Sequence, residues 1–381
     1  MAIGSREAAL ASSLFRKFYS KYGISADDVE KREFGFGNFE TKIAYRHMAF
    51  KSNEELKKRV VSEAPPFISF STARYKDPAG RPLESKGWLG SELIFDLDST
   101  DLNLQCQKVH GKSWVCSECL DAVKEETAKL VEEFLFADFG FSKEDITLNF
   151  SGNRGYHVHV IADTIMKLTS RERKEISDYI SGIGLDPVMF FPNFGGKGKM
   201  VGPKATDAGW GGHIARGFIS RLNSGTAELK KLGISGQSAK KLEEHKAELI
   251  FGVSTGNWDK VDVPKKDEFW KSIISGMTIS QSDSIDKNVT NDIHHLIRMA
   301  GTIHGDTGLV ARKLDGYSSL SGFDPMTKCV VFRSGSLDVV VEDSPEVEIG
   351  GSTFGPYRNS KQTLPTYAAL YLMLKRRAVL A

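Results

Sequence analysis

The segment "ELIFDLD", Glu92 to Asp98, has the apolar content of a buried strand but ends in two acidic residues. Because side chains alternate along a strand, its leucines and phenylalanine point to one face. Asp96 and Asp98 then share the opposite face with Ile94, where each carboxylate opposes ionisation of the other unless a cation lies between them. An Asp-x-Asp pair is also a common turn signal. This segment alone therefore leaves a metal site and a turn as alternatives.

The composition describes an ordinary globular protein. The chain has 381 residues, 40% of them hydrophobic, and a formal net charge of +2. Two domains are the expectation for this length, and the small positive charge permits a phosphate-rich partner without requiring one. No apolar run reaches the roughly 18 residues of a membrane span. The charged N-terminal segment 5–23 has apolar residues at helical spacing, unlike a signal peptide, so we expect an intracellular protein without a membrane partner.

Helix-like and strand-like segments alternate along most of the chain, which predicts a mixed α/β body. We expect helices over about 7–22, in "EELKKRVVSEA", over roughly 120–137 and in the closing "TYAALYLMLKRRAVLA". We expect strands in "REFGFG", "TKIAYRHMAF", "PFISFSTARY", the acidic segment and "KCVVFRSGSLDVVVED". Segment 216–277 is rich in Lys and Glu at helical spacing, which predicts a small helical insertion subdomain between 1–215 and 278–381.

Three of the four cysteines lie close together with a histidine in "CQKVHGKSWVCSEC". The spacing C-x3-H-x5-C-x2-C is formed by Cys106, His110, Cys116 and Cys119. Thiolate and imidazole are the ligands that tetrahedral zinc prefers, and four protein ligands leave no position for a substrate. We therefore expect a structural zinc knuckle; the alternative is unrelated buried thiols beside a surface histidine. Cys329, in an apolar segment, is expected to be a core thiol of a strand.

The segment "DITLNFSGNRGYHVHVIAD" predicts a β-hairpin with a glycine-rich turn. Ser151 ends the incoming strand, Arg154 lies in the turn, and His157 and His159 share one face of the outgoing strand. Hydroxyl, guanidinium and imidazole groups can all donate to phosphate oxygens, and glycines allow a ligand to approach the backbone. An ordinary turn with a solvated arginine is the alternative.

A second glycine-rich segment, "RMAGTIHGDTG", follows a cluster of acids. We expect Arg298 to end a helical turn, with His304 in the loop six residues on. A helix end capped by Gly301 explains only the first glycine and not the second group, Gly305 to Gly308. Upstream, "SIDKNVTNDIHH" offers three possible acidic partners for the strand aspartates, and spacing does not choose among Asp283, Asp286 and Asp292.

These segments, in this order and over most of the chain, resemble the catalytic small subunit of the archaeal and eukaryotic DNA primases. The resemblance rests on "REFGF", "RHMAF", "IFDLD", the Cys/His loop, "SGNRGYH", "LIRMAGTIHGDTGL" and "LPTYAALYL". It implies a sheet of the RNA-recognition-motif type flanked by helices, with the zinc knuckle 106–119 beside the catalytic strand. It also implies a catalytic domain over 1–215 and 278–381, interrupted by the helical insertion 216–277.

The resemblance assigns roles to individual residues. Asp96 and Asp98 match the family's metal-binding pair for Mg²⁺ or Mn²⁺. Asp286 matches the third carboxylate, ahead of Asp292, because "IDKNVT" aligns with a short strand before the family's "LIR" helix. The implied nucleotide-binding positions are Ser151, Arg154, His157, Arg298, His304, Glu33 and Arg46. An exposed ion pair is the alternative for the last two.

The implied activity is template-directed nucleotidyl transfer that makes primers de novo on single-stranded DNA from NTPs or dNTPs. Two divalent ions would serve this chemistry. The implied partner is a large primase subunit with an iron–sulfur domain, and an archaeal source would place the pair at the nucleoid. The alternatives are a primase-polymerase of repair or a mobile element, and a non-catalytic zinc protein that binds nucleic acid.

The last motif departs from the family pattern. The family usually reads like P-G-S-x-H-G-K-T-G, whereas this chain has Ala300, Thr302 and Asp306 in place of Pro, Ser and Lys. An acid is unfavourable beside a triphosphate. We therefore expect Asp306 to turn away and Arg312 or Lys313 to supply the missing positive charge.

Overall fold

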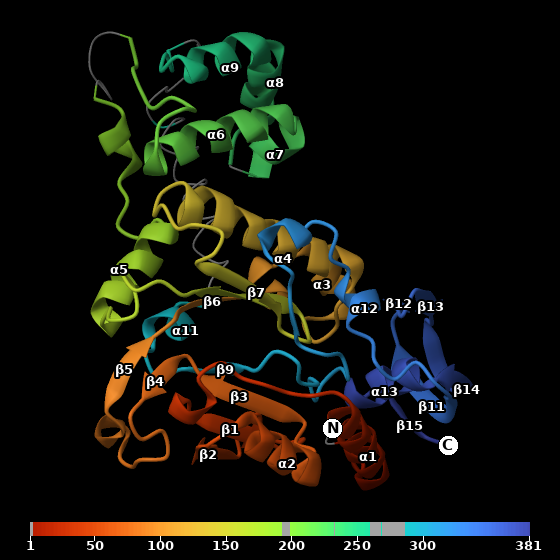
Figure 1. Cartoon of the computed structure of the whole chain (residues 1–381). Coiled ribbons are helices and arrows are strands. Elements are labelled where there is room, and N and C mark those ends of the chain that lie inside the picture. The colour runs from red at the N-terminus through yellow and green to blue at the C-terminus, as the bar shows by residue number, and fades with distance from the viewer. Residues whose placement is uncertain (1–2, 193–198, 232, 260–267, 269–285) are drawn as a thin grey trace. The chain divides into compact units, whose positions relative to one another are not determined.

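The computed structural model describes residues 3–192, 199–231, 233–259, 268 and 286–381 (Figure 1). The chain forms two compact units. The first comprises 1–128, 142–174 and 286–381, and the second comprises 129–141 and 175–285. The second unit thus contains the segment 216–277 together with further residues on either side in the sequence. That 216–277 is a subdomain of its own stays a prediction, and part of it lies outside the described residues.

One sheet of the first unit has the order β2-β1-β3-β9, with every neighbouring pair antiparallel. Its strands are Tyr45–Met48, Phe34–Gly37, Phe67–Ser71 and Leu296–Arg298. Helices α1 (Ser5–Lys21) and α2 (Asn53–Glu63), both predicted, pack against each other beside these strands in Figure 1. The N-terminal part of the predicted pattern is therefore confirmed.

The expected helical turn at Arg298 is wrong, because the segment Leu296–Arg298 is strand β9. Arg298 pairs with Ser69 of β3, more than 200 residues earlier in the chain, and all three β9 residues are buried. A three-residue apolar segment has no period to distinguish helix from strand. Its partner strand therefore decides its conformation.

The other large sheet has the order β10-β7-β8-β6 and is also antiparallel. Its strands are Arg312–Lys313, Ile146–Phe150, Gly155–Val160 and Leu93–Asp98. The register sets Asp96 opposite His157 and Asp98 opposite Gly155. The predicted hairpin is confirmed, and so is the alternation along the acidic strand, whose leucines and phenylalanine are at most 1% exposed.

Helices follow β6 along the chain. They are η3 (Ser99–Leu102), α3 (Gln105–His110) and α4 (Ser117–Lys129), and α4 continues as a π-helix over Leu130–Phe136. The helix predicted over 120–137 is therefore confirmed, although its last turns are π-type. The expected core stripe is buried, at Leu120, Val123, Leu130, Val131 and Phe134.

The short helix α11 (Lys287–Asn291) replaces the strand expected before "LIR". Asp286 caps it, since its Oδ1 accepts a hydrogen bond of 2.9 Å from the Asn288 amide. Val289 then packs against Ile94 of β6 and Ile297 of β9. An aspartate cap with one buried turn behind it stabilises a helix at this position, and the helix brings Asp286 to the acidic strand.

The C-terminal region contains a three-stranded sheet, β14-β11-β15, and the hairpin β12–β13. These strands are Tyr357–Pro365, Ser336–Ser344, Ala378–Leu380, Val347–Ile349 and Ser352–Phe354. Helix α13 (Thr366–Leu374) is buried at every residue except the half-buried Tyr367. The closing helix thus ends earlier than predicted, because the last residues pair with β11 as β15. Cys329 is buried as predicted, but it caps helix α12 (Pro325–Lys328) and is not in a strand.

The predicted strand "PFISFSTARY" is divided into β3 and β4 (Ala73–Tyr75), and β4 pairs with β5 (Trp88–Ser91). Three short 3-10 helices complete the first unit, at Val29–Lys31, Leu83–Lys86 and Tyr317–Ser319. Across the described part of the chain, the structure has no helix with the length and apolarity needed to cross a membrane.

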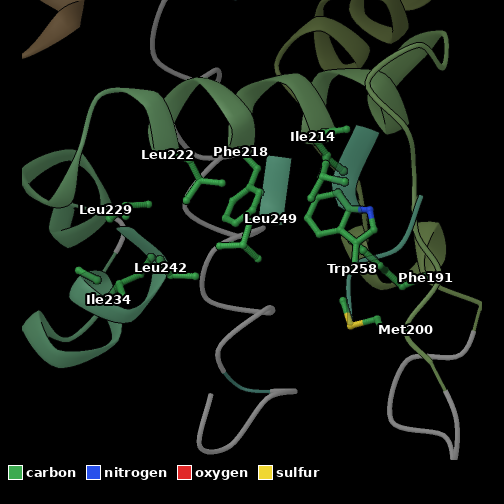
Figure 2. Close-up of a cluster of buried hydrophobic side chains, with 13 residues drawn as sticks. Phe191, Met200, Ile214, Phe218, Leu222, Leu229, Ile234, Leu242, Leu249 and Trp258 are labelled. Carbon is green, nitrogen blue, oxygen red and sulfur yellow. The ribbon is translucent and has the colours of Figure 1, made fainter. Parts of the chain in front are cut away.

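The described part of the second unit is helical. Its elements are the π-helix Leu130–Phe136, the 3-10 helix Pro187–Phe190, α6 (Gly209–Asn223), α7 (Thr226–Lys231), α8 (Gly236–Glu244) and α9 (Lys246–Ser254), while α5 (Ser170–Ile180) spans both units. Figure 2 shows the core of this unit, in which Phe218, Leu222 and Trp258 are fully buried. The helices expected in the Lys/Glu-rich segment are confirmed at α7, α8 and α9.

Candidate active site

The acidic end of β6 brings carboxylates together. Burial, with the nearby charges of Asp98 and Asp286, raises the pKa of Asp96 to about 7. The amide of Asp286 donates a hydrogen bond of 3.1 Å to the Asp96 carbonyl, which joins the cap of α11 to the strand. The carboxylates therefore repel one another in the protein alone, and a bound cation would relieve that repulsion.

A further carboxylate, Asp101, belongs to this group and was missed from the sequence. Burial and the charges of Asp98 and Asp286 raise its pKa. It lies in η3, whose first turn is capped by Asp98: the Asp98 Oδ1 accepts from the Thr100 amide at 2.9 Å and from its hydroxyl at 3.0 Å. The spacing Asp98-x-x-Asp101 was the available signal, because one turn of helix returns the later acid towards the earlier one.

Of the other proposed third carboxylates, Asp292 has a different partner. Its carboxylate lies 3.7 Å from His295 Nδ1, and the proximity of that histidine lowers its pKa. Asp283 lies outside the described residues. The structure thus places Asp286 beside Asp96, while its role as a metal ligand stays a prediction.

Arg154 links the glycine turn to the acidic strand. Its Nη2 and Nε donate to Asp98 Oδ2 at 3.0 and 3.2 Å, and its Nη1 donates to the Lys112 carbonyl at 3.2 Å. One guanidinium therefore contacts the acidic strand and the Cys/His loop. The turn itself is held by Ser151, whose Oγ accepts from the amides of Asn153 and Gly155 at 3.3 Å.

The glycine turn packs directly on the loop that contains His304. Gly152 has a φ of +85°, and a Cβ there would lie 2.9 Å from the Cβ of His304 and 3.1 Å from the Ala311 amide nitrogen. Thr307 Oγ1 also donates to the Gly152 carbonyl at 2.6 Å. Only glycine fits this conformation and this approach. Two motifs about 150 residues apart in sequence therefore form one surface.

His304 is a buried neutral donor. The Asp306 amide donates to its Nδ1 at 3.1 Å, and an amide can only donate, so the ring proton lies on Nε2. Burial and the positive charges of Arg298, Lys42, Lys375 and Arg154 hold the pKa of His304 well below its usual value. Its Nε2–H is thus available in a region of concentrated positive charge.

Arg298 is 9% exposed and lies over the Phe67 ring, 4.9 Å from the ring centre. Its Nη1 donates to the Ile68 carbonyl at 3.4 Å, and burial lowers its pKa to about 10. Among the residues that the structure describes, no carboxylate forms a salt bridge with it. A buried guanidinium without an acidic partner fits an anionic ligand.

His157 faces the acidic strand from β8, with its Nε2 3.6 Å from Asp96 Oδ1. Burial and nearby positive groups, chiefly His159 and Arg298, keep its pKa well below the usual value. Its Nδ1 is buried without a hydrogen-bond partner in the protein. Such an atom in a functional site is a candidate ligand contact, because buried polar groups are nearly always paired.

Glu33 is fully buried and accepts hydrogen bonds from two cationic side chains. Its Oε1 accepts from Arg46 Nε at 2.8 Å, and its Oε2 accepts from Lys86 Nζ at 2.8 Å. Burial alone would raise the pKa of Glu33, but Arg46 and Lys86 lower it overall. Lys86 is buried, whereas Arg46 is half-exposed. Of these two cations, Arg46 is therefore the one that can contact a ligand.

The four Cys/His residues form a compact ligand group whose ligand atoms all lie within 4.8 Å of one another. Cys119 Sγ lies 3.5 Å from Cys106 Sγ, 3.7 Å from Cys116 Sγ and 3.6 Å from His110 Nε2. Tetrahedral zinc–thiolate bonds require sulfur–sulfur separations of about 3.8 Å. His110 Nδ1 donates to the Gly111 carbonyl at 2.8 Å, which leaves Nε2 free to bind a metal.

In the described part of the chain, no other group of three or more potential ligands is as compact. The aspartates at β6 are thus a looser set than the Cys/His group. The geometry fits zinc at the Cys/His group, whereas the aspartates offer only the type of ligand, carboxylate oxygen, that Mg²⁺ and Mn²⁺ prefer.

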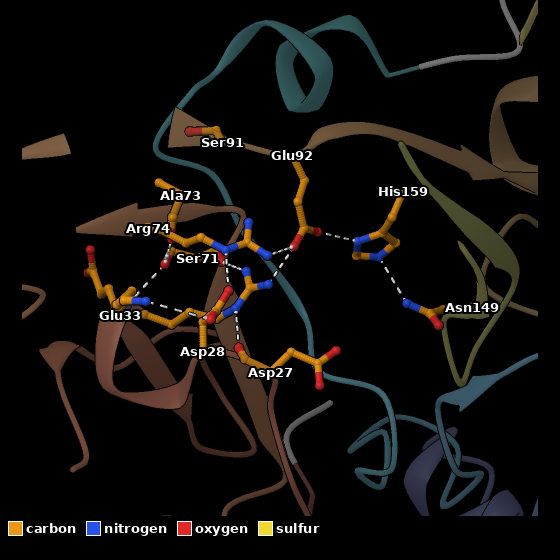
Figure 3. A network of polar contacts seen from close by, with 12 residues as sticks. Asp27, Asp28, Glu33, Ser71, Ala73, Arg74, Ser91, Glu92, Asn149 and His159 are labelled. Carbon is orange, nitrogen blue, oxygen red and sulfur yellow. Dashed lines mark hydrogen bonds and ion pairs between the residues drawn. The ribbon is translucent and has the colours of Figure 1, made fainter. Parts of the chain in front are cut away.

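A buried polar network anchors the start of β6 (Figure 3). Glu92, 2% exposed, accepts from His159 Nδ1 at 2.8 Å, and it forms ion pairs with Arg74, 3.1 Å from its Nη2, and with Arg32. Burial would raise the pKa of Glu92, but His159 and Arg32 hold it well below its usual value. These partners of Glu92 could not be predicted from the sequence, because they lie far from it along the chain.

The protein is of the mixed α/β class, and its site combines acidic and basic groups. The site has carboxylates at a strand end, phosphate-type donors on a glycine turn and a Cys/His group of metal ligands. A family model described as DNA primase small subunit matches residues 95–315. The chain belongs to the DNA primase small-subunit family.

Curated relatives agree over nearly the whole length. "DNA primase small subunit PriS" of Methanothrix thermoacetophila is 33% identical, over 97% of this chain and 98% of the relative. The proteins of the same name from Methanococcoides burtonii and Thermoplasma acidophilum are each 33% identical, over 96% of this chain and 96% and 98% of their own lengths. This chain is similar to these archaeal proteins from end to end.

Proposed function

We propose that this chain is the catalytic subunit of a DNA primase, which makes short RNA or DNA primers de novo on single-stranded DNA during replication. Family membership supports the class. The observation that most directly supports the chemistry is the contact between the glycine turn and the His304 loop, because it gathers phosphate-type donors beside the acidic end of β6.

Asp96, Asp98 and Asp286 would hold divalent ions. When bound, Mg²⁺ or Mn²⁺ would make the primer 3′-hydroxyl a better nucleophile and offset charge on the phosphates. The three carboxylates supply the hard oxygen ligands that these ions prefer, and their mutual repulsion favours cation binding.

The basic groups would bind the triphosphate of the incoming nucleotide. Arg298 supplies a buried positive charge, which would neutralise charge on the triphosphate. His304 supplies a neutral Nε2–H donor, which would orient the triphosphate. Ser151, Arg154 and His157 would complete the pocket from the hairpin, and Arg46, held by Glu33, would contribute from β2. Donors already fixed by burial and hydrogen bonds need little reorganisation during the reaction.

Three further features belong to the proposal. The Cys/His group would bind structural zinc, and its loop would support the turn through Arg154. The strand–helix–hairpin arrangement of β6, β7 and β8 supports a core of the RNA-recognition-motif type. By analogy with the name "small subunit", the working enzyme would contain a large subunit, and an iron–sulfur domain in that partner is our expectation.

The test is primer synthesis by the purified chain on unprimed single-stranded DNA with labelled nucleotides and Mg²⁺ or Mn²⁺. The matched control is the Asp96→Ala/Asp98→Ala double variant. Product from the wild type alone supports the proposal. Extension of a supplied primer without de novo synthesis favours a polymerase that needs its partner to start. Single-strand binding without synthesis in either assay would overturn the enzyme proposal and favour the binding-protein alternative.

A further inference from the structure

Lys375, just beyond helix α13, lies against the glycine turn. Its backbone amide caps the helix, while its Nζ donates to the Ser113 carbonyl at 3.1 Å and to Asn153 Oδ1 at 3.0 Å. Asn153 directly precedes Arg154 in the turn. This contact could not be predicted from the sequence, since "LKRR" after an apolar helix is an ordinary basic end.

Two cations are held side by side by one loop. The carbonyl of Lys112 accepts from Arg154, and the next carbonyl, that of Ser113, accepts from Lys375. Asp98 balances the charge of Arg154, whereas Lys375 has only carbonyl dipoles and the Tyr371 ring, 5.7 Å from Nζ, which balance its charge in part. An anion between the two side chains would stabilise both of them.

Helix α13 also packs on the His304 loop. A Cβ on Gly308 would lie 2.9 Å from Leu370 Cδ2 and 3.4 Å from Leu374 Cδ1. The end of the helix, and with it Lys375, therefore lies at the same surface as His304. Two of the three donor hydrogens of the ammonium have protein acceptors, and within the described residues no carboxylate lies at salt-bridge distance from Nζ.

We propose, on the basis of the primase function proposed above, that Lys375 binds the terminal phosphates of the incoming nucleoside triphosphate together with Arg154 and His304. The α-phosphate must lie near Asp98, where the reaction occurs. Arg154 contacts Asp98 on one side and Lys112 on the other, and Lys375 is anchored one residue further along the loop. It therefore faces the end of the triphosphate that leaves as pyrophosphate.

This role supplies the positive charge that Asp306 removes from the loop. The substitutes expected from the sequence lie elsewhere: Arg312 donates to the Lys328 carbonyl at 2.8 Å, and both it and Lys313 are exposed on β10. Lys375 reaches the turn from the far end of the sequence, so a local motif comparison does not find it.

The experiment measures equilibrium binding of ATP, AMP and inorganic tripolyphosphate to the full chain by calorimetry in the presence of Mg²⁺. Lys375→Met keeps the apolar stem over Tyr371 and removes the charge. We expect about a ten- to hundredfold weaker affinity for ATP and tripolyphosphate, because a charged hydrogen bond to phosphate is lost, and nearly unchanged affinity for AMP. Arg377→Ala, which removes a neighbouring cation paired with Asp343, is the control and should match the wild type.

A second variant separates binding from folding. Asp306→Lys in the Lys375→Met background should recover most of the lost ATP affinity, because it returns a cation to the same surface from the His304 loop. Equal losses for ATP and AMP would mean that Lys375 only shapes the turn, and unchanged ATP affinity would mean no contact; either overturns the inference. Tight ATP binding by the wild type with no effect in the variant defeats this inference alone, whereas no ATP binding by the wild type defeats the proposed function as well.

Discussion

Arg154 and Asp98 form an ion pair in which two guanidinium nitrogens, at 3.0 and 3.2 Å, donate to the same carboxylate oxygen. This pair joins the glycine turn to the acidic strand. It also means that a metal ion at Asp98 must share or replace the guanidinium there, because a cation and an arginine compete for the same lone pairs. Metal and nucleotide binding are therefore expected to be coupled through Arg154.

Arg154→Ala should have opposite effects on the two ligands. Affinity for Mn²⁺ without nucleotide should rise severalfold, because a competing positive charge leaves Asp98. Affinity for ATP should fall by about tenfold or more, because a charged phosphate contact is lost. Mn²⁺ titration followed by electron paramagnetic resonance, with calorimetry for ATP, measures both. Arg312→Ala, at an exposed position on β10, is the matched control, and a fall in both affinities would contradict the idea of competition.

Asp96→Asn should abolish synthesis yet stabilise the protein when no Mg²⁺ or Mn²⁺ is added. The pKa of Asp96 is raised to about 7 in the folded state, against about 3.9 in an unfolded chain. Ionisation of Asp96 therefore lowers the stability of the wild type as pH rises between these values. The variant avoids this loss, so the difference in melting temperature should be absent below about pH 4, grow towards about pH 7 and then stay constant.

The pKa difference of about three units corresponds to a gain of up to about 4 kcal/mol, and each 1 kcal/mol raises the melting temperature by roughly 2–4 °C. Added Mg²⁺ should stabilise the wild type more than the variant, because the cation then relieves the repulsion. Thermal melts across pH, with and without Mg²⁺, make the comparison. A variant that is less stable than the wild type at pH 8 without added Mg²⁺ would show that repulsion at Asp96 is not significant.

The local patterns in the sequence were sufficient for β6, the hairpin and the Cys/His group. Alternation, a glycine turn and ligand spacing all act within about 20 residues, so each can be seen without knowing the fold. Strand β9 could not be predicted in the same way, because Leu296 and Arg298 take their conformation from pairing with β3. The same reason applies to β15, whose partner is β11.

The missed site residues depend on contacts that only the fold creates. Lys375 meets Asn153 more than 200 residues away in sequence, and Glu92 meets Arg32, which follows the 3-10 helix Val29–Lys31, and His159 of β8. A basic residue at a helix end and an acid at a strand start are common everywhere. Their chemistry is decided by what the folded chain brings to them.

Gly152→Ala should disrupt the surface shared by the turn and the His304 loop. The new Cβ would lie 2.9 Å from His304 Cβ, and the residue would keep a left-handed φ of +85°. Gly316→Ala is the control, since Gly316 has a similar φ of +75° but nothing within 4 Å of the added Cβ. Both should lose about 1 kcal/mol to backbone strain, but only Gly152→Ala should also weaken ATP binding. Equal ATP affinities in the two variants would show that the close packing does not matter for binding.

Removal of zinc should loosen the loop that holds two cations of the site. Cys116→Ser should eliminate bound zinc, measured by elemental analysis, and lower stability by about 2 kcal/mol or more, or roughly 4–8 °C. It should also weaken ATP binding, because Lys112 and Ser113 then no longer fix Arg154 and Lys375. Cys329→Ser changes a buried thiol outside the group and should leave the zinc content unchanged. Equal zinc content in the two variants would contradict the assignment of Cys116 as a ligand.

Glu92→Gln should destabilise the protein in a pH-dependent way. The pKa of Glu92 is held well below its usual value by His159 and Arg32, despite its burial. Its charge therefore contributes stability above about pH 4.3, the unfolded value, and this contribution is lost as pH falls towards the lower folded pKa. Near pH 7 the variant should be less stable by about 3 kcal/mol, because Arg32 is left without its buried partner, and the difference should shrink below about pH 4. Chemical denaturation at several pH values measures this difference in stability. Glu348→Gln, at an exposed position on β12, is the control. A difference that does not depend on pH would mean that Glu92 contributes its shape and not its charge.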